Sequence, residues 1–133
     1  MGSAQDSCQP EAGDKVKIDS RQKYVAFAEE SLREAFDKLE KGTFEDKKLH
    51  GLLDGAFDDL KKDPLVGIKI PKKLWPGEYV RKYDIDNLRK YNLPNGWRLI
   101  YTLRGTQVEI VAVILEWFAS HKEYEKRFGY KVN

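Results

Sequence analysis

Apolar residues recur every three or four positions over two consecutive stretches in the first half of the chain, which is the spacing of amphipathic helices. The first predicted helix starts at Lys23 and stops at Gly42, with apolar positions at Val25, Ala28, Leu32, Ala35, Phe36 and Leu39. The second ends near Pro64 and has apolar positions at Leu49, Leu52, Leu53, Phe57 and Leu60. Thr43, with Asp46 three residues later, can cap its N-terminus. The short loop between the two stretches predicts an antiparallel helical hairpin.

The second half of the chain changes to a spacing of two, which is typical of strands. We predict strands over residues 88–93 and 97–103, joined by a hairpin turn at Asn95-Gly96. In the later strand one face carries Trp97, Leu99, Tyr101 and Leu103, and the other carries Arg98, Ile100 and Thr102. Residues 108–115 are the most apolar segment and are predicted to form the central strand. A short first strand is predicted at residues 16–18, and residues 65–86 look irregular.

These elements predict an α+β fold, in which the helical hairpin packs on one face of a small antiparallel sheet. The order is β-α-α-β-β-β, followed by a C-terminal segment over residues 116–130 that forms a short helix or an ordered tail. The chain has 133 residues, of which 41% are hydrophobic, and this suits one domain with a core of ordinary size. Residues 1–13 are small and polar, so we interpret them as a disordered N-terminal tail and 14–133 as the single domain.

Composition argues against several classes of protein. The longest apolar run, residues 110–115, has about six residues, whereas a membrane-spanning helix needs about 20. The one cysteine, Cys8, cannot build a disulfide framework or a four-ligand zinc site. No secretory signal pattern is visible at the N-terminus. We therefore expect a soluble cytoplasmic domain without a metal site.

The net charge of +2 hides an uneven distribution. Residues 1–66 hold 11 Lys and Arg against 15 Asp and Glu, a net charge of −4. Residues 67–133 hold 13 Lys and Arg against 7 Asp and Glu, a net charge of +6. A basic half beside an acidic half suggests that one face binds a polyanion, although chance alone can produce an imbalance of this size.

One short motif connects the predicted hairpin to a known family. Residues 96–101, Gly-Trp-Arg-Leu-Ile-Tyr, resemble the Gly-Tyr-Arg-Leu-Val-Tyr strand of RelE-type toxins in the RelE/ParE superfamily. Residues 120–124, Ser-His-Lys-Glu-Tyr, are similar to the end of the last strand in members that carry a histidine and an aromatic residue there. The resemblance covers roughly residues 16–130, and the predicted order of elements agrees with it.

The resemblance implies a RelE-like fold and the activity of a ribosome-dependent mRNA endoribonuclease (mRNA interferase), the toxin of a type II toxin–antitoxin system. Cleavage proceeds by attack of the 2′-hydroxyl on the adjacent phosphate and needs no metal or cofactor. The implied partners are a cognate antitoxin, the ribosome and mRNA, with no membrane. The implied state is a monomer or a toxin–antitoxin hetero-oligomer. Two alternatives stay open: a ParE-like poison of DNA gyrase, and an inactive binding module.

The resemblance also assigns catalytic residues. Arg98 would hold the scissile phosphate, because a guanidinium can bind two phosphate oxygens at once; otherwise it is a solvated strand residue. Arg89 would lie across the hairpin from Arg98. His121 would act as general acid, or would simply be exposed. Tyr124 would stack on a base, or would pack the terminal segment on the sheet.

Further residues are candidates for RNA binding. Tyr91 stands where the family has a second lysine, and Lys90 beside it is expected to point to the opposite face from Arg89. Lys69, Lys72, Lys73 and Lys122 are candidates for phosphate contacts, or keep their segments solvated. Two further residues are less distinctive: His50 is expected to be an exposed helix residue, and Glu116 is an alternative base that its spacing does not single out.

Overall fold

The computed structural model describes residues 20–118 and 121–128, the side chains of His121 and Lys122 excepted. The predicted tail at 1–13, Cys8 and the predicted strand at 16–18 lie outside these residues. The elements in chain order are β2 (Gln22–Phe27), α1 (Glu30–Leu39), α2 (Phe44–Lys62), β3 (Ile68–Lys69), the 3-10 turn η2 (Lys72–Leu74), α3 (Gly77–Tyr83), β4 (Arg89–Asn92), the 3-10 turn η3 (Pro94–Gly96), β5 (Arg98–Gly105), β6 (Glu109–Phe118) and α4 (His121–Phe128). The fold is α+β, as predicted.

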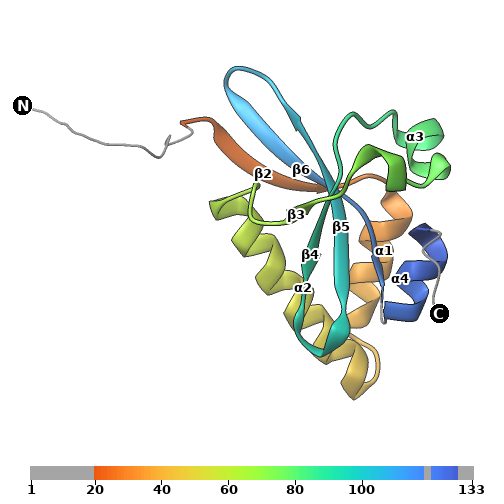
Figure 1. Cartoon of the computed structure of the whole chain (residues 1–133). Helices are drawn as coiled ribbons and strands as arrows, with labels where there is room; N and C mark the ends of the chain where they lie inside the picture. The colour runs from red at the N-terminus through yellow and green to blue at the C-terminus, as the bar shows by residue number, and fades with distance from the viewer. Residues whose placement is uncertain (1–19, 119–120, 129–133) are drawn as a thin grey trace, which may run out of the picture.

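The described strands form one five-stranded sheet in the order β2-β6-β5-β4-β3 (Figure 1). β2 runs parallel to β6, and the other neighbours are antiparallel. The prediction of a purely antiparallel sheet was therefore wrong. The predicted central strand, residues 108–115, corresponds to β6, which is an interior strand but not the middle one. The middle position belongs to β5, because β3 adds a strand beyond β4. The central side chains Leu99, Ile100 and Tyr101 have no exposed surface.

The first predicted helix began too early in the chain. Residues 22–27 form the strand β2, and α1 begins only at Glu30. Alternate residues of β2 are exposed and half-buried, and Val25 pairs with Ala112 of β6. Val25 and Ala28 happen to fit a helical spacing as well. The parallel partner lies far away in the chain, so local periodicity did not reveal it.

The second helix and the hairpin turn were predicted correctly. Thr43 and Asp46 form a reciprocal capping box at the start of α2, with both backbone-to-side-chain bonds present. Asn95 and Gly96 both adopt positive φ, 65° and 81°, which is why this dipeptide closes the β4–β5 hairpin. The amide of Leu93 donates to the carbonyl of Trp97 at 2.8 Å and closes the loop.

Both faces of the sheet are covered, not one. Helices α1 and α2 cover the first face, where Leu53, Leu60, Leu99, Tyr101 and Ile114 form the core. The second face has its own core, formed by Ile70, Tyr79, Ile100, Leu115, Phe118 and Tyr124. The segment predicted as irregular supplies β3 to the edge of the sheet and α3 to this second layer, and the C-terminal segment supplies α4. We call this second face the α4 face.

Candidate functional site

The register of the β4–β5 hairpin decides which cations lie together. Arg98 pairs with Asn92 on one side and Phe118 on the other, and Lys90 pairs with Ile100. Directly opposed residues in a sheet share a face, as do residues two apart in one strand. Arg98 and Lys90 therefore both lie on the α4 face, where Ile100 and Phe118 are buried.

These two cations converge on one aromatic ring. The Nζ atom of Lys90 lies 5.0 Å from the centre of the Tyr124 ring, and the Cζ atom of Arg98 lies 5.3 Å from it. Both distances are within the range of a cation–π interaction. The strands supply the cations and α4 supplies the ring, so the cluster Lys90–Arg98–Tyr124 joins the β4–β5 hairpin to the C-terminal helix.

A bulge in β6 lies beside this cluster. Ile100 pairs with Glu116, but Tyr101 pairs with Ile114, so Leu115 is one extra residue in β6. Leu115 is buried in the α4-face core. Bulges of this kind re-aim side chains and occur often next to active sites. Here the bulge sets the register in which the last residues of β6 pair with β5 before α4 begins.

The surroundings of Lys90 lower the pKa of its amine. Partial burial is the main cause of its lowered pKa, and the positive charge of Arg98 lowers that pKa further. An ordinary lysine is almost fully charged at neutral pH. A lysine with a lowered pKa holds a larger neutral fraction, and that neutral amine can accept a proton.

Arg89 does not belong to this cluster. It pairs with Tyr101, and its Nη1 donates to the carbonyl oxygens of Leu65 at 3.0 Å and Gly67 at 2.7 Å. The prediction that Arg89 faces Arg98 while Lys90 points away was therefore wrong. The physical reason is register: the turn places Asn92, and hence Lys90, on the face of Arg98.

Tyr91 also faces away from the cluster. It pairs with Leu99 and donates its hydroxyl to Oδ2 of Asp59 on α2 at 2.6 Å. This hydrogen bond is the main cause that raises the pKa of Tyr91 to about 12. Tyr91 therefore fastens the sheet to α2 and is not oriented toward Arg98, contrary to a role in the same RNA site.

Tyr124 is buried and packed, with 1% of its surface exposed. Its ring stacks on Phe128 at 4.5 Å between centroids and meets Phe118 edge-on at 6.1 Å. In this structure the ring is not available to stack on an RNA base, so the packing alternative is the one observed. Its place beneath two cations is what the sequence did not anticipate.

The remaining candidates lie at two different places. Lys72 and Lys73 are exposed in η2. His121 and Lys122 open α4, one helical turn before Tyr124. The predictions for these two residues concern side chains outside the described part of the structure. His50 is half-buried, and its ring stacks on Phe36 at 4.3 Å, so it belongs to the packing between α1 and α2.

Sequence reasoning missed a polar cluster that holds α3 and α4 against the sheet. Tyr79 donates to Oε1 of Glu116, and Nη2 of Arg127 donates to Oε2 of Glu116 at 3.0 Å. Nη1 of Arg127 also pairs with Glu78. Burial, followed by the hydrogen bond to Glu116, raises the pKa of Tyr79. Glu116 is therefore engaged as an anchor and is not placed as a base.

The described residues contain neither a candidate metal site nor a membrane-spanning helix. No group of three or more His, Cys, Asp or Glu side chains is placed to hold a metal ion among them. None of the helices in the described ranges combines the length and apolarity needed to cross a bilayer. Comparison with known protein families, with curated proteins and with solved structures found no match.

Proposed function

We propose that this chain is an endoribonuclease that cleaves mRNA on the ribosome, the toxin of a RelE-like toxin–antitoxin pair. The observation that carries the proposal is the convergence of Lys90 and Arg98 on Tyr124 of α4, the helix that begins at His121. Lys90, Arg98 and His121 supply the residue types that a metal-independent transesterification needs: a base, a charge for the phosphorane, and an acid.

Each group has a distinct task in this reaction. Neutral Lys90 takes the proton of the 2′-hydroxyl, and the 2′-oxygen forms a bond to phosphorus. Arg98 binds the non-bridging oxygens, whose negative charge grows in the transition state. The bond from phosphorus to the 5′-oxygen then breaks, and His121 gives that oxygen a proton. The products are a 2′,3′-cyclic phosphate and a 5′-hydroxyl.

Tyr124 has a supporting role in this proposal. Its buried ring lies within cation–π distance of both Lys90 and Arg98, and so keeps two like charges near each other on the sheet. We assign Tyr124 as a positioning residue, which replaces the expectation of base stacking. Tyr124→Phe keeps the ring, whereas Tyr124→Leu removes it.

The test is a cell-free translation reaction with a defined mRNA, in which cuts are mapped by primer extension. Wild type should cut only in the presence of ribosomes, and Arg98→Gln and His121→Ala should each lose the cuts. Arg33→Gln is the matched control, because Arg33 is an exposed arginine on α1, away from the α4 face. Intact mRNA at high concentrations of folded wild-type protein would overturn the proposal.

A second candidate is a binding module without catalysis. Burial of Tyr124 favours it, because the ring that would meet a base is covered by α4 packing. The same assay separates the two: a binding module stops translation or associates with ribosomes while the mRNA stays whole. A gyrase poison would leave translation intact and inhibit DNA supercoiling in a parallel assay.

A further inference from the structure

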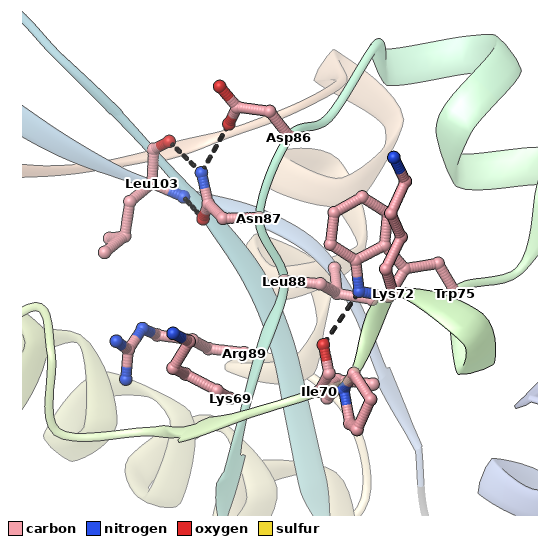
Figure 2. Close-up of a pocket in the computed structure, with 10 residues that line it drawn as sticks. Lys69, Ile70, Lys72, Trp75, Asp86, Asn87, Leu88, Arg89 and Leu103 are labelled. Carbon is pink, nitrogen blue, oxygen red and sulfur yellow. Dashed lines mark hydrogen bonds between the residues drawn. The ribbon is translucent and has the colours of Figure 1, made fainter.

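A second basic site lies at the N-terminal end of β4, and none of the residues of the Lys90–Arg98–Tyr124 cluster lines it. It is a pocket of about 660 Å³ between the end of β3, the turn η2 and the residues that lead into β4 (Figure 2). We call it the β3–β4 pocket. Arg89 lines it, whereas its neighbour Lys90 extends from the strand toward the opposite face.

Three cations line this pocket, with Lys69 and Arg89 together on one side and Lys72 beside Trp75 on the other (Figure 2). Lys69 and Arg89 are direct cross-strand partners, and like charges in this position destabilise a sheet. Within the described residues, neither Lys69 nor Lys72 uses its ammonium group in a hydrogen bond or ion pair. The lining residues include one acid, Asp86, which leaves the pocket with an excess of two positive charges. An anion bound between the cations would relieve their repulsion.

The opposite wall of the pocket is a fixed aromatic surface. The Nε1–H group of Trp75 donates to the carbonyl of Ile70 at 2.8 Å, which holds the indole in place (Figure 2). Ile70 and Leu88 also line the pocket and are 5% and 2% exposed, so their side chains are anchored in the core. A flat ring beside a cationic rim is suited to the base and the phosphate of a nucleotide.

Asn87 keeps the base of the pocket rigid. Its Oδ1 accepts from the amide of Leu103 at 2.7 Å, and its Nδ2 donates to the carbonyl of Leu103 at 2.8 Å (Figure 2). Oδ1 also accepts from the hydroxyl of Thr102 at 3.1 Å. The side chain thus replaces a backbone partner and continues the β4–β5 ladder. A pocket built on hydrogen-bonded backbone is largely formed before a ligand arrives.

We propose that the β3–β4 pocket binds a nucleoside monophosphate unit. The phosphate lies between the cross-strand partners Lys69 and Arg89, and the base lies against Trp75, beside Lys72. The guanidinium of Arg89 uses Nη1 to hold two carbonyl oxygens and has further N–H groups to offer. The unit is either a free nucleotide or one nucleotide of an RNA strand. The proposal does not depend on whether the chain cleaves RNA.

The test measures binding to the full-length chain by isothermal titration calorimetry, without ribosomes or mRNA. The probes are AMP, adenosine, inorganic phosphate and a short oligoadenylate. AMP should bind more tightly than adenosine or phosphate alone. Tighter binding of oligoadenylate than of AMP assigns the unit to an RNA strand, and equal or weaker binding assigns it to a free nucleotide. Since no cleavage is measured, failure here is separate from failure of the nuclease proposal.

Variants identify the pocket as the binding site. Lys69→Glu should weaken AMP binding about tenfold or more, the cost of losing a charged contact. It should also raise the melting temperature, because it replaces a like-charge pair with an opposite-charge pair.

Trp75→Leu should remove the preference for AMP over phosphate. Lys47→Glu, the same charge change at an exposed position on α2, is the control. Equal AMP affinity in wild type and Lys69→Glu, or no saturable AMP binding by wild type, would overturn the proposal.

Discussion

Single residues carry the chemistry of the candidate site, and Lys90 is the one whose role changed most between sequence and structure. The motif around Arg98 was recognisable because it occupies consecutive positions. The partner of Arg98 was not, because it depends on the register of the hairpin. A shift of one residue exchanges the faces of every side chain in a strand, so Arg89 and Lys90 change places. Local sequence does not contain that information.

Lys90 makes a prediction about pH. The pKa of Lys90 is lowered. Its neutral amine, the proposed base, therefore becomes the main form at a lower pH than the amine of an ordinary lysine does. Because His121 must also be protonated to serve as the acid, the pH profile of ribosome-dependent cleavage should be bell-shaped, and its alkaline limb should begin below about pH 10.4, the ordinary lysine value. Lys90→Arg keeps the positive charge but cannot give up its proton, so it should bind RNA and fail to cleave. Cleavage by Lys90→Arg at the wild-type rate would show that Lys90 is not the base.

Tyr101 makes a prediction about stability. Its hydroxyl is fully buried, donates to the carbonyl of Pro64 at 2.7 Å and accepts from the amide of Gly67 at 2.9 Å. Tyr101→Phe leaves both backbone groups without this partner and should lower the free energy of unfolding by about 1–3 kcal/mol. Urea denaturation measures the change. Tyr24→Phe, at a tyrosine that is 47% exposed, is the control and should have little effect.

At the scale of elements, local patterns predicted α2 and the β4–β5 hairpin well and failed where the partner was distant. Helix α2 has its own cap and apolar stripe, and the hairpin has Asn95-Gly96 in the required conformation. β2 was assigned to a helix because its parallel partner β6 begins only at Glu109. Helix α3 was missed because it is short and begins directly after Pro76, within a segment rich in turn residues.

The sheet order predicts which amides exchange most slowly. β5 is the middle strand, and both of its faces are covered, so amides of residues 99–102 should be the most protected from hydrogen exchange. From composition alone, the amides of the apolar segment 108–115 would be expected to exchange most slowly. Slower exchange across β6 than across β5 would contradict the central position of β5.

The contacts that attach α4 to the rest of the fold predict how this helix detaches from the candidate site. Arg127 joins α4 to Glu116 of β6 and Glu78 of α3, at side chains that are partly exposed. Arg127→Met should speed hydrogen exchange in α4 while the central strands keep their protection. Lys126→Met, at an exposed position on the same helix, should not. If both variants behave alike, the apolar contacts of Tyr124 and Phe128 hold α4 without help from Arg127.

For the whole molecule, the division of charge along the sequence becomes a division in space. The acidic half of the chain ends before β3, so it supplies β2 and the helices α1 and α2. The basic half supplies β3, β4, β5, β6, α3 and α4, and with them both the Lys90–Arg98–Tyr124 cluster and the β3–β4 pocket. A polyanion should therefore approach the α4 face and the β3–β4 edge, and avoid the helical hairpin.

Salt dependence tests this orientation. Affinity for single-stranded RNA should fall as salt rises, and the slope of log affinity against log salt should decrease by about 0.7 for each phosphate contact removed. The double variant Lys72→Gln/Lys73→Gln removes two exposed charges of η2 and should flatten the slope. Lys47→Gln/Lys48→Gln removes the same charge from the exposed face of α2 and should leave it unchanged. Equal effects of the two pairs would mean that net charge, and not the basic face, governs RNA binding.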